Sequence, residues 1–312
     1  MLNLGYACMN MELSSKGITA ARTCRKATFE SKGLPHVGQL FESNLQSLIK
    51  IMVWNVNNNY SLFRMSSDMA PWASEYKLED LPNWEKCEQL IKQVGHIART
   101  NGIRLSFHPG QFVCLASKNE KVVKNAIKDL EIHGQLMDLM GMPRNRWAKI
   151  NIHMGGAYGD RESAASRFLD NFAKLSQSVQ TRLTLENDDR PNLFSTEDLY
   201  NLICSRTDIP IVFDYHHHAA HTGGMSEQEA LEMAISTWGN VKPTCHYSES
   251  AQLERGEKAP FRAHSKFIYS KIEDYGHDLD VMVEAKNKEE AVAKYLKDWG
   301  KEDELHGVNN AL

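Results

Sequence analysis

Residues 209–218 read IPIVFDYHHH, an apolar strand that ends in a group of metal-binding side chains. The run of Ile, Val and Phe is typical of a parallel strand that is covered on both faces. It leads into Asp214, His216, His217 and His218, one carboxylate and three imidazoles. Burial of such polar groups costs desolvation free energy unless they are paired, and a divalent cation is the usual partner. For any one of these histidines taken alone, a hydrogen-bonded structural role explains the sequence equally well.

The same arrangement, a short apolar strand followed by polar side chains, recurs along the chain between segments with helical periodicity. We expect strands at 2–8, 60–66, 104–107, 148–152, 182–185, 209–214, 243–247 and 280–283. We expect helices at 34–59, 83–100, 119–140, 162–179, after Ser195, at 226–237 and at 288–299. Eight strands in alternation with helices predict an α/β fold, a single (β/α)8 TIM barrel. The barrel should span residues 1–300 and leave 301–312 as a polar tail that frays.

Composition fits a single soluble barrel. The chain has 312 residues, of which 42% are hydrophobic and 24% charged, which is ordinary for a globular protein. No apolar run approaches the roughly 18 residues of a membrane-spanning helix, and the N-terminus lacks the pattern of a secretion signal. The six cysteines form no CxxC pair, which argues against a disulfide framework or a zinc ribbon. We therefore expect a cytoplasmic protein with no membrane partner.

Histidines and carboxylates share one position relative to the predicted strands. In a TIM barrel the C-terminal ends of the strands form one ring, where the chemistry takes place. Six strand ends carry such residues: His108, His153, Glu186, Asp214 with His217, His246 and Glu284. The set exceeds what one tetrahedral ion needs. It suits two or three divalent ions, such as manganese or zinc, and Glu186 is able to bridge them.

Two reaction classes fit such a cluster. Closely spaced divalent ions stabilise the attacking and leaving oxygens of a phosphodiester displacement, whereas the alternative is a metal-dependent sugar isomerase or epimerase of the TIM-barrel type. The segment 11–33 favours a polymer. It holds five basic residues, Arg22 and Arg25 among them, against two acidic ones, 5 − 2 = +3, although the whole chain has a formal charge of −4. We expect Arg22 and Arg25 to contact phosphates. The alternative is a solvated charged loop.

Six motifs carry a resemblance along nearly the whole chain. They are LGYACMN, SFHPGQF, IHMGGAYG, LENDDR, VFDYHHH and VMVEAK, in this order. The chain thereby resembles the UV damage endonuclease family, which is similar in fold to endonuclease IV. The resemblance implies cleavage of the phosphodiester bond 5′ of ultraviolet photoproducts and some other lesions in duplex DNA, without ATP and with a manganese-type cluster. The implied partner is UV-damaged double-stranded DNA, bound by a monomer that in a prokaryote would associate with the nucleoid at damage.

The resemblance also assigns roles to individual residues. The implied metal ligands are His108, His153, Glu186, Asp214, His217, His246, His264 and Glu284. Glu186, Asp214, His217 and Glu284 are expected to carry the catalysis. Tyr6, Asn10, Gln111 and Phe112 match positions that read the lesion, although Phe112 alone would be taken for a core residue at the barrel rim. His216, His218 and His221 are more simply explained by a helical turn than as ligands.

One position departs from the family's pattern. The family often has a lysine, thought to be modified, two residues before the histidine of strand seven. Here that position is Thr244, and the nearest lysine is Lys242. Two residues along a strand span about 6.6 Å. We therefore expect that Lys242 does not substitute for the missing lysine.

Overall fold

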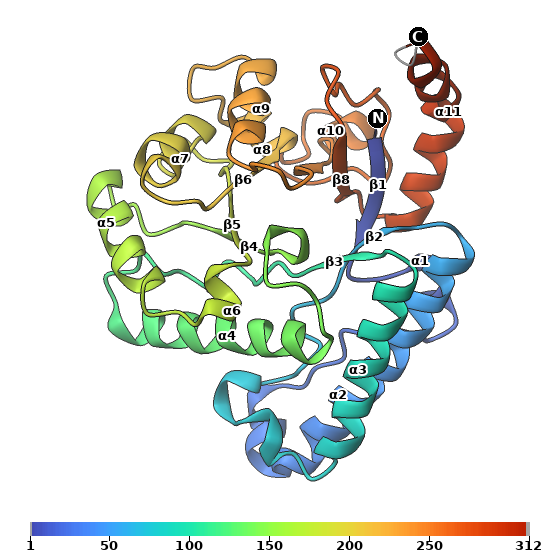
Figure 1. Cartoon of the computed structure of the whole chain (residues 1–312), viewed down its shortest axis with the longest axis vertical. Coiled ribbons are helices and arrows are strands. Elements are labelled where there is room, and N and C mark those ends of the chain that lie inside the picture. The colour runs from blue at the N-terminus through green and yellow to red at the C-terminus, as the bar shows by residue number, and fades with distance from the viewer. Residues whose placement is uncertain (1, 310–312) are drawn as a thin grey trace.

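The computed structural model describes the backbone of residues 2–309 and the side chains of residues 2–300. Eight parallel strands form one sheet in the order β3-β2-β1-β8-β7-β6-β5-β4, with helices around it (Figure 1). The strands are β1 (Leu2–Ala7), β2 (Leu62–Arg64), β3 (Arg104–Ser106), β4 (Ile150–His153), β5 (Leu183–Glu186), β6 (Ile211–Asp214), β7 (Thr244–Tyr247) and β8 (Leu279–Val283). A single parallel bridge, Phe107 to Ile150, joins the edge strands β3 and β4. The sheet is thus a nearly closed barrel, as the sequence predicts.

The helices follow the strands in the predicted alternation. They are α1 (Met11–Ser15), α2 (Lys26–Asn57), α3 (Trp84–Thr100), α4 (Glu120–Leu139), α5 (Arg161–Phe172), α6 (Gln177–Gln180), α7 (Thr196–Leu202), α8 (Tyr215–Ala220), α9 (Glu227–Ser236), α10 (Gln252–Arg255) and α11 (Lys288–Asn309). Short 3-10 helices lie at Ala73–Glu75, Leu78–Asp80, Arg146–Ala148 and Cys204–Arg206. Ser195 and Ser226 each begin a helix with a reciprocal capping box, which satisfies backbone groups that the first turn leaves free.

Three predicted segments differ from the structure. Segment 11–33 contains α1 and the first turns of α2, which is interrupted at Gly33, where φ is 61°. The predicted helix 162–179 is two helices, α5 and α6, because Ser176 adopts an extended conformation between them. Helix α11 continues to Asn309, so most of the predicted tail 301–312 belongs to it, while residues 310–312 lie outside the described part of the chain.

Polar side chains fill much of the barrel interior. Because successive residues of a strand face opposite sides, Arg104 of β3 points inward and reaches Asp280 of β8 at 2.7 Å. A small apolar group of Ala7, Leu62 and Met282 lies beside these polar residues. Gly5 is needed there, since a Cβ atom would lie 2.2 Å from the Leu62 carbonyl oxygen.

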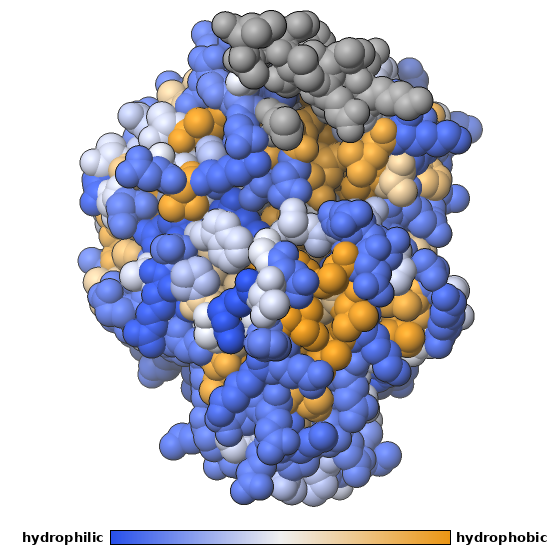
Figure 2. Space-filling view, turned by 45° about the vertical axis from the view of Figure 1, so that its right-hand side comes forward, coloured by the Kyte–Doolittle hydropathy of each residue, from blue (hydrophilic) through white to orange (hydrophobic). Residues whose placement is uncertain are grey.

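Hydrophilic side chains cover most of the face seen in Figure 2, and apolar side chains gather in patches near its centre. Among the described residues, no helix combines the length and the apolar character that crossing a membrane requires.

Candidate metal centre

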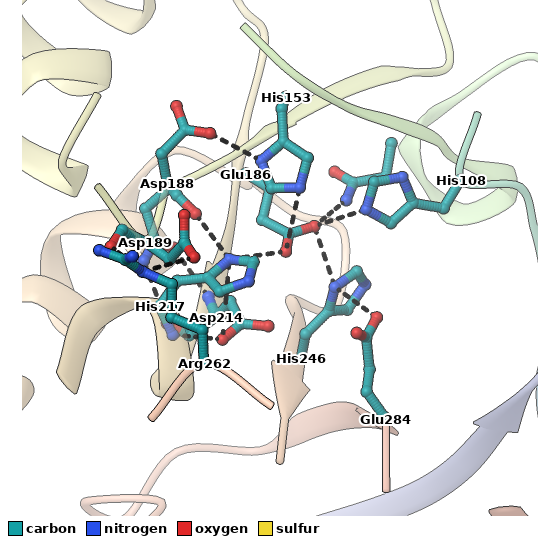
Figure 3. A network of polar contacts seen from close by, with 12 residues as sticks. His108, His153, Glu186, Asp188, Asp189, Asp214, His217, His246, Arg262 and Glu284 are labelled. Carbon is teal, nitrogen blue, oxygen red and sulfur yellow. Dashed lines mark hydrogen bonds and ion pairs between the residues drawn. The ribbon is translucent and has the colours of Figure 1, made fainter. Parts of the chain in front are cut away.

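Glu186, at the end of β5, is the centre of the polar cluster inside the ring of strand ends (Figure 3). Its side chain is 1% exposed. Its Oε2 lies 3.0 Å from His108 Nε2 and 3.0 Å from His246 Nδ1. Its Oε1 lies 3.2 Å from His217 Nδ1 and 3.8 Å from His153 Nε2. One carboxylate therefore faces four imidazoles that come from four different strand ends.

Two further carboxylates complete the cluster. Glu284 Oε1 lies 3.3 Å from His246 Nδ1, and Asp214 Oδ1 lies 3.9 Å from His217 Nδ1. The second oxygen of Asp214 is buried and has no hydrogen-bond partner among the described residues. A buried carboxylate oxygen without a partner is costly, and a cation would satisfy it.

Three sets of side chains have ligand atoms close enough together to hold an ion. Within each set the atoms lie within 4.8 Å of one another, and the sets are His108 with Glu186 and His246, His153 with Glu186 and His217, and Asp214 with His246 and Glu284. Glu186 and His246 each belong to two sets. Imidazole and carboxylate groups are the ligands that manganese and zinc accept, so the donor set fits divalent ions.

The four imidazoles divide into two pairs by protonation. Burial opposes the charged form of His153, but the Glu186 and Asp188 carboxylates outweigh it and raise the pKa of His153 to about 9. Asp214 and Glu186 likewise outweigh burial and raise the pKa of His217 to about 11. Burial dominates at the other pair: it lowers the pKa of His246 to about 4 and also lowers the pKa of His108. The carboxylates thus attract protons onto one pair of imidazoles, as they would attract a cation.

The carboxyl groups of Glu186 and Asp214 differ in the direction in which their pKa is shifted. Burial would raise the pKa of Glu186, but His246, His153 and His108 hold this pKa well below its usual range. Burial raises the pKa of Asp214 to about 7. Asp214 is therefore the carboxyl group of the cluster that takes up a proton near neutral pH.

Neighbouring polar groups orient the candidate ligands. The Asn151 amide donates to Glu186 Oε2, and Asn151 in turn accepts from the Thr184 hydroxyl at 2.8 Å. His153 Nδ1 lies 3.0 Å from Asp188 Oδ1. Such outer contacts fix the orientation of metal-binding side chains.

His264 lies at the edge of the cluster. Its Nδ1 is 3.1 Å from the Glu284 carbonyl oxygen and 4.0 Å from Glu284 Oε2. It belongs to none of the three sets, so its role as a ligand stays a prediction. His216 and His218 are buried in α8, where His216 stacks on Phe261 at 5.2 Å and His218 packs against Phe213. Like His221, which follows α8, they stand outside the three sets.

Lys149 and Arg64 bring two positive charges that sequence reasoning missed. Lys149 is fully buried, and its Nζ lies 3.4 Å from His246 Nε2. Burial, together with Arg64 and Arg104, lowers the pKa of Lys149 to about 7. Arg64, at the end of β2, forms an ion pair with Glu284. The alternation of Lys149, Asn151 and His153 along one strand face is the signal that could have found the lysine.

The position of the missing family lysine is buried. Thr244 has no exposed surface, and its hydroxyl has no hydrogen-bond partner in the described structure. Lys242 turns away from the cluster to Asp278 and Asp280, at 3.0 and 3.2 Å. It therefore does not substitute for a lysine at 244, as expected.

The four residues expected to read the lesion fall into two groups. Gln111 and Phe112 are exposed after the His-Pro-Gly turn, with Phe112 84% exposed. Tyr6 and Asn10 have no exposed surface. Tyr6 points outward into the helix layer, packs against Trp54 and shares hydrogen bonds with Asn10 and Asn55. Neither side chain is accessible to DNA in this conformation, so the role of Tyr6 and Asn10 in reading the lesion stays a prediction.

The two arginines of segment 11–33 also differ. Arg22 is half-buried and donates to the carbonyl oxygens of Thr19 and Gly17 and to the Ser47 hydroxyl. Arg25 is exposed at the start of α2. Of the two, Arg25 has a guanidinium without a side-chain partner among the described residues, whereas phosphate contact by Arg22 would compete with its structural bonds.

A nearly closed parallel barrel with imidazoles and carboxylates gathered at its C-terminal strand ends defines a TIM-barrel protein with a candidate centre for several ions. A family model described as UV-endonuclease UvdE matches residues 2–311. The chain therefore belongs to the UV-damage endonuclease family.

Individual relatives agree with this assignment. The chain is 31% identical to a UV DNA damage endonuclease of Bacillus cereus, over 99% of this chain and 96% of the relative. It is 37% identical to a UV-damage endonuclease of Schizosaccharomyces pombe over 93% of this chain, but spans only 49% of that relative's length. A crystal structure titled SacUVDE superimposes with a TM-score of 0.82 at 30% identity, covering 97% of this chain and 99% of that one.

More distant structures share the fold alone. Endonuclease IV from Thermus thermophilus gives a TM-score of 0.54 at 12% identity, covering 82% of this chain and 94% of that one. A D-psicose 3-epimerase from Clostridium cellulolyticum gives 0.51 at 14% identity, covering 75% of this chain and 78% of that one. The fold by itself therefore does not separate a nuclease from an epimerase.

Proposed function

We propose that this chain is a metal-dependent DNA repair endonuclease. It hydrolyses the phosphodiester bond on the 5′ side of ultraviolet photoproducts, and of some other lesions, in duplex DNA and without ATP. The observation that carries the proposal is Glu186, a buried carboxylate that faces four imidazoles from separate strand ends. Family membership supports DNA as the substrate, because the Bacillus cereus relative that this chain covers almost completely is a UV DNA damage endonuclease.

Divalent ions would be held by the three sets of ligands described above. We favour two or three ions and manganese, with zinc and magnesium as alternatives. When bound, such ions supply the positive charge that stabilises the attacking and leaving oxygens of an in-line phosphodiester displacement.

The charge of the site supports this assignment. Glu186, Asp214 and Glu284 together with Asp188 place four carboxylates near the reaction position. Arg64, which is paired with Glu284, and Lys149 oppose them, as do the protonated imidazoles of His153 and His217. Without ions, the site therefore offers an anionic phosphodiester little net attraction. Divalent cations, when bound, would take the place of these protons, add positive charge and make the ring attractive to a DNA backbone.

The protein's own groups hold the geometry and the proton. Asn151 fixes one oxygen of Glu186, and Arg64 fixes one oxygen of Glu284. Burial raises the pKa of the Asp214 carboxyl to about 7 in the metal-free protein, and its Oδ2 has no hydrogen-bond partner among the described residues. Asp214 would therefore release a proton when this oxygen binds an ion.

Recognition of the lesion is assigned to the exposed pair Gln111 and Phe112. A photoproduct is already poorly stacked, so taking it out of the duplex costs less than for intact bases. The Phe112 ring would stack in the vacated space, which is worth roughly 1–3 kcal/mol per base. The protein would act as a monomer, since one ring of strand ends supplies every group named here.

The test is cleavage of an end-labelled duplex that carries one cyclobutane pyrimidine dimer, with manganese and without ATP. We expect one cut on the 5′ side of the dimer, and no cut after chelation. Glu186→Gln should abolish cleavage and lower the bound metal measured by mass spectrometry, because the carboxylate shared by two sets of ligands loses its charge. The far-ultraviolet circular dichroism should stay unchanged.

Glu162→Gln is the matched control. Glu162 is an exposed carboxylate on α5 whose salt-bridge partner is Arg206, at 3.6 Å, and its substitution should change neither cleavage nor metal content. Wild-type cleavage by Glu186→Gln would refute the proposed centre. An intact duplex together with epimerisation of a ketose would favour the sugar epimerase instead.

A further inference from the structure

Tyr158 is an exposed aromatic side chain on the loop between β4 and α5. It is 58% exposed, and its φ is 47°, a left-handed conformation that non-glycine residues rarely adopt. The loop reaches this conformation with glycines of positive φ at 155, 156 and 159. The loop follows His153, so it lies on the same end of the barrel as the candidate metal centre. A bulky residue in a conformation suited to glycine marks a local strain, and such strain is concentrated at functional sites.

Two cationic side chains accompany the ring. Lys118 Nζ lies 5.2 Å and Arg167 Cζ lies 5.7 Å from its centroid, both within the range of cation–π attraction. Arg167 is fixed, since it donates to the carbonyl oxygens of Ala116 at 2.7 Å and Gly156 at 2.8 Å. Lys118 is exposed, so its ammonium is able to move from the ring to an anionic ligand.

The loop of Tyr158 is locked to the loop that carries Gln111 and Phe112. Arg167 binds one carbonyl in each loop. A Cβ atom on Gly156 would lie 2.8 Å from the backbone of Ala116, so glycine permits the close approach of the two loops. The two exposed aromatic residues, Phe112 and Tyr158, are therefore presented by one rigid unit on the rim.

Tyr158 differs from Tyr269, a second exposed aromatic residue, in how the nearby carboxylates are engaged. Asp160 is the acidic group beside Lys118, but its oxygens already accept from the backbone and hydroxyl of Ser163. Tyr269 also has a lysine over its ring, Lys294 at 5.8 Å, but its hydroxyl donates to the Glu254 carboxylate at 2.8 Å. A carboxylate at that distance repels a phosphate, so Tyr269 lacks the character of a nucleotide site.

We propose that Tyr158 and Lys118 form a nucleotide-binding subsite on the rim, in which the ring stacks on a base or sugar and the ammonium contacts the adjoining phosphate. The subsite holds the DNA strand beside the position where Phe112 enters the duplex. Arg167 positions the subsite through its bonds to the two loops. This inference rests on the proposed endonuclease function. It adds a contact that neither the metal ligands nor the pair Gln111 and Phe112 provides.

The test is single-turnover cleavage of the dimer-containing duplex with manganese, at a series of enzyme concentrations. Tyr158→Asn keeps a residue that tolerates the left-handed conformation but removes the ring. It should raise the half-saturating enzyme concentration by about 5- to 150-fold, with the maximal rate and the metal content unchanged. Tyr158→Phe, which keeps the ring, should behave as wild type. Lys118→Gln should weaken binding and reduce the salt slope of affinity by about one unit.

Tyr269→Asn is the matched control and should leave the half-saturating concentration unchanged. The subsite is refuted if Tyr158→Asn saturates like wild type, or if Tyr158→Phe loses as much affinity as Tyr158→Asn. If Tyr158→Asn misfolds, the salt slope of Lys118→Gln still decides, because an unchanged slope excludes a phosphate contact. A wild-type protein that never cuts the damaged duplex refutes the proposed function, whereas normal wild-type cleavage with indifferent variants refutes only the subsite.

Discussion

Tyr6 lies between the barrel and its helices, where its hydroxyl donates to Asn55 and accepts from the Asn10 amide. Tyr6→Phe would leave both asparagine groups without this partner inside the protein. We expect the free energy of unfolding to fall by roughly 1–3 kcal/mol, measured by urea denaturation, with the preference for damaged duplex retained. Unchanged stability together with a lost preference would favour direct lesion contact by Tyr6.

Lys149 makes the stability of the metal-free protein depend on pH. Its pKa falls from the usual value of 10.5 to about 7 on folding, so the folded state binds this proton less readily than the unfolded state. The resulting destabilisation is absent above pH 10.5, grows as the pH falls towards 7, and is constant below that. Lys149→Met removes it. The variant should therefore have a higher melting temperature than wild type, and this difference should increase from pH 10 to pH 7.

The control for this prediction is Lys242→Met, which removes a lysine paired with Asp278 and Asp280 on the same barrel. Its melting temperature relative to wild type should not rise as the pH falls. Chelated protein is used throughout, because bound ions would change the charge around Lys149. A pH-independent difference between wild type and Lys149→Met would show that the lysine keeps its proton, and hence its usual pKa, in the folded protein across this range.

Single residues of the site were predictable to different degrees. The strand ends that carry His108, His153 and Glu186 follow from sequence, because the period of two and the barrel topology fix where such side chains meet. Lys149 obeys the same period but was missed, since a lysine alone on an apolar strand suggests an edge or a surface position. The burial of Tyr6 could not be predicted from the sequence, because a motif gives a residue's identity and not the side of the strand that is open to solvent.

At the scale of elements, strands and caps were predictable and the first connection was not. Ser195 and Ser226 begin their helices as the capping pattern indicates, and the apolar runs locate every strand of the barrel. Segment 11–33 has many polar residues and a glycine, which favours a loop reading. Its helices α1 and the start of α2 depend on tertiary contacts, such as the bond from the Glu12 amide to the Glu289 carboxylate at 2.8 Å.

The same connection supplies a prediction about DNA binding. Arg25 is exposed, whereas Arg22 holds the carbonyl oxygens of Thr19 and Gly17. Arg25→Ala should lower duplex affinity and reduce the salt slope by about one unit, with unchanged stability. Arg22→Ala should lower the melting temperature as well, because it removes those structural bonds. Fluorescence anisotropy at several salt concentrations measures the affinity and its salt slope. Unchanged slopes for both variants would favour the alternative, that segment 11–33 is a solvated surface without phosphate contacts.

At the scale of the whole molecule, the barrel has one weak seam and the candidate centre lies across it. Strands β1 and β8 share five registered pairs, from Leu2 with Leu279 to Tyr6 with Val283. Between β3 and β4 there is one bridge, with the Phe107 amide 3.0 Å from the Lys149 carbonyl oxygen and the Asn151 amide 2.9 Å from that of Phe107. His108 and His153 stand on opposite sides of this seam, and both face Glu186.

Ions held by these side chains would link β3 to β4 through Glu186, so metal should stabilise the seam more than the rest of the barrel. In the metal-free protein, the amides of Phe107 and Asn151 should exchange with solvent deuterium faster than those of β1 and β8, because a seam with one bridge opens locally. Manganese at about 100 times its dissociation constant adds about 2.7 kcal/mol to the free energy of any local opening that releases an ion. Exchange at the seam should then slow by about 100-fold and approach that of β1 and β8, as followed by mass spectrometry of peptides from each strand. Glu186→Gln should remove the effect. If manganese leaves the difference between the seam and β1–β8 unchanged, the ions do not bridge β3 and β4, and the ligand sets that contain His108 and His153 are wrong.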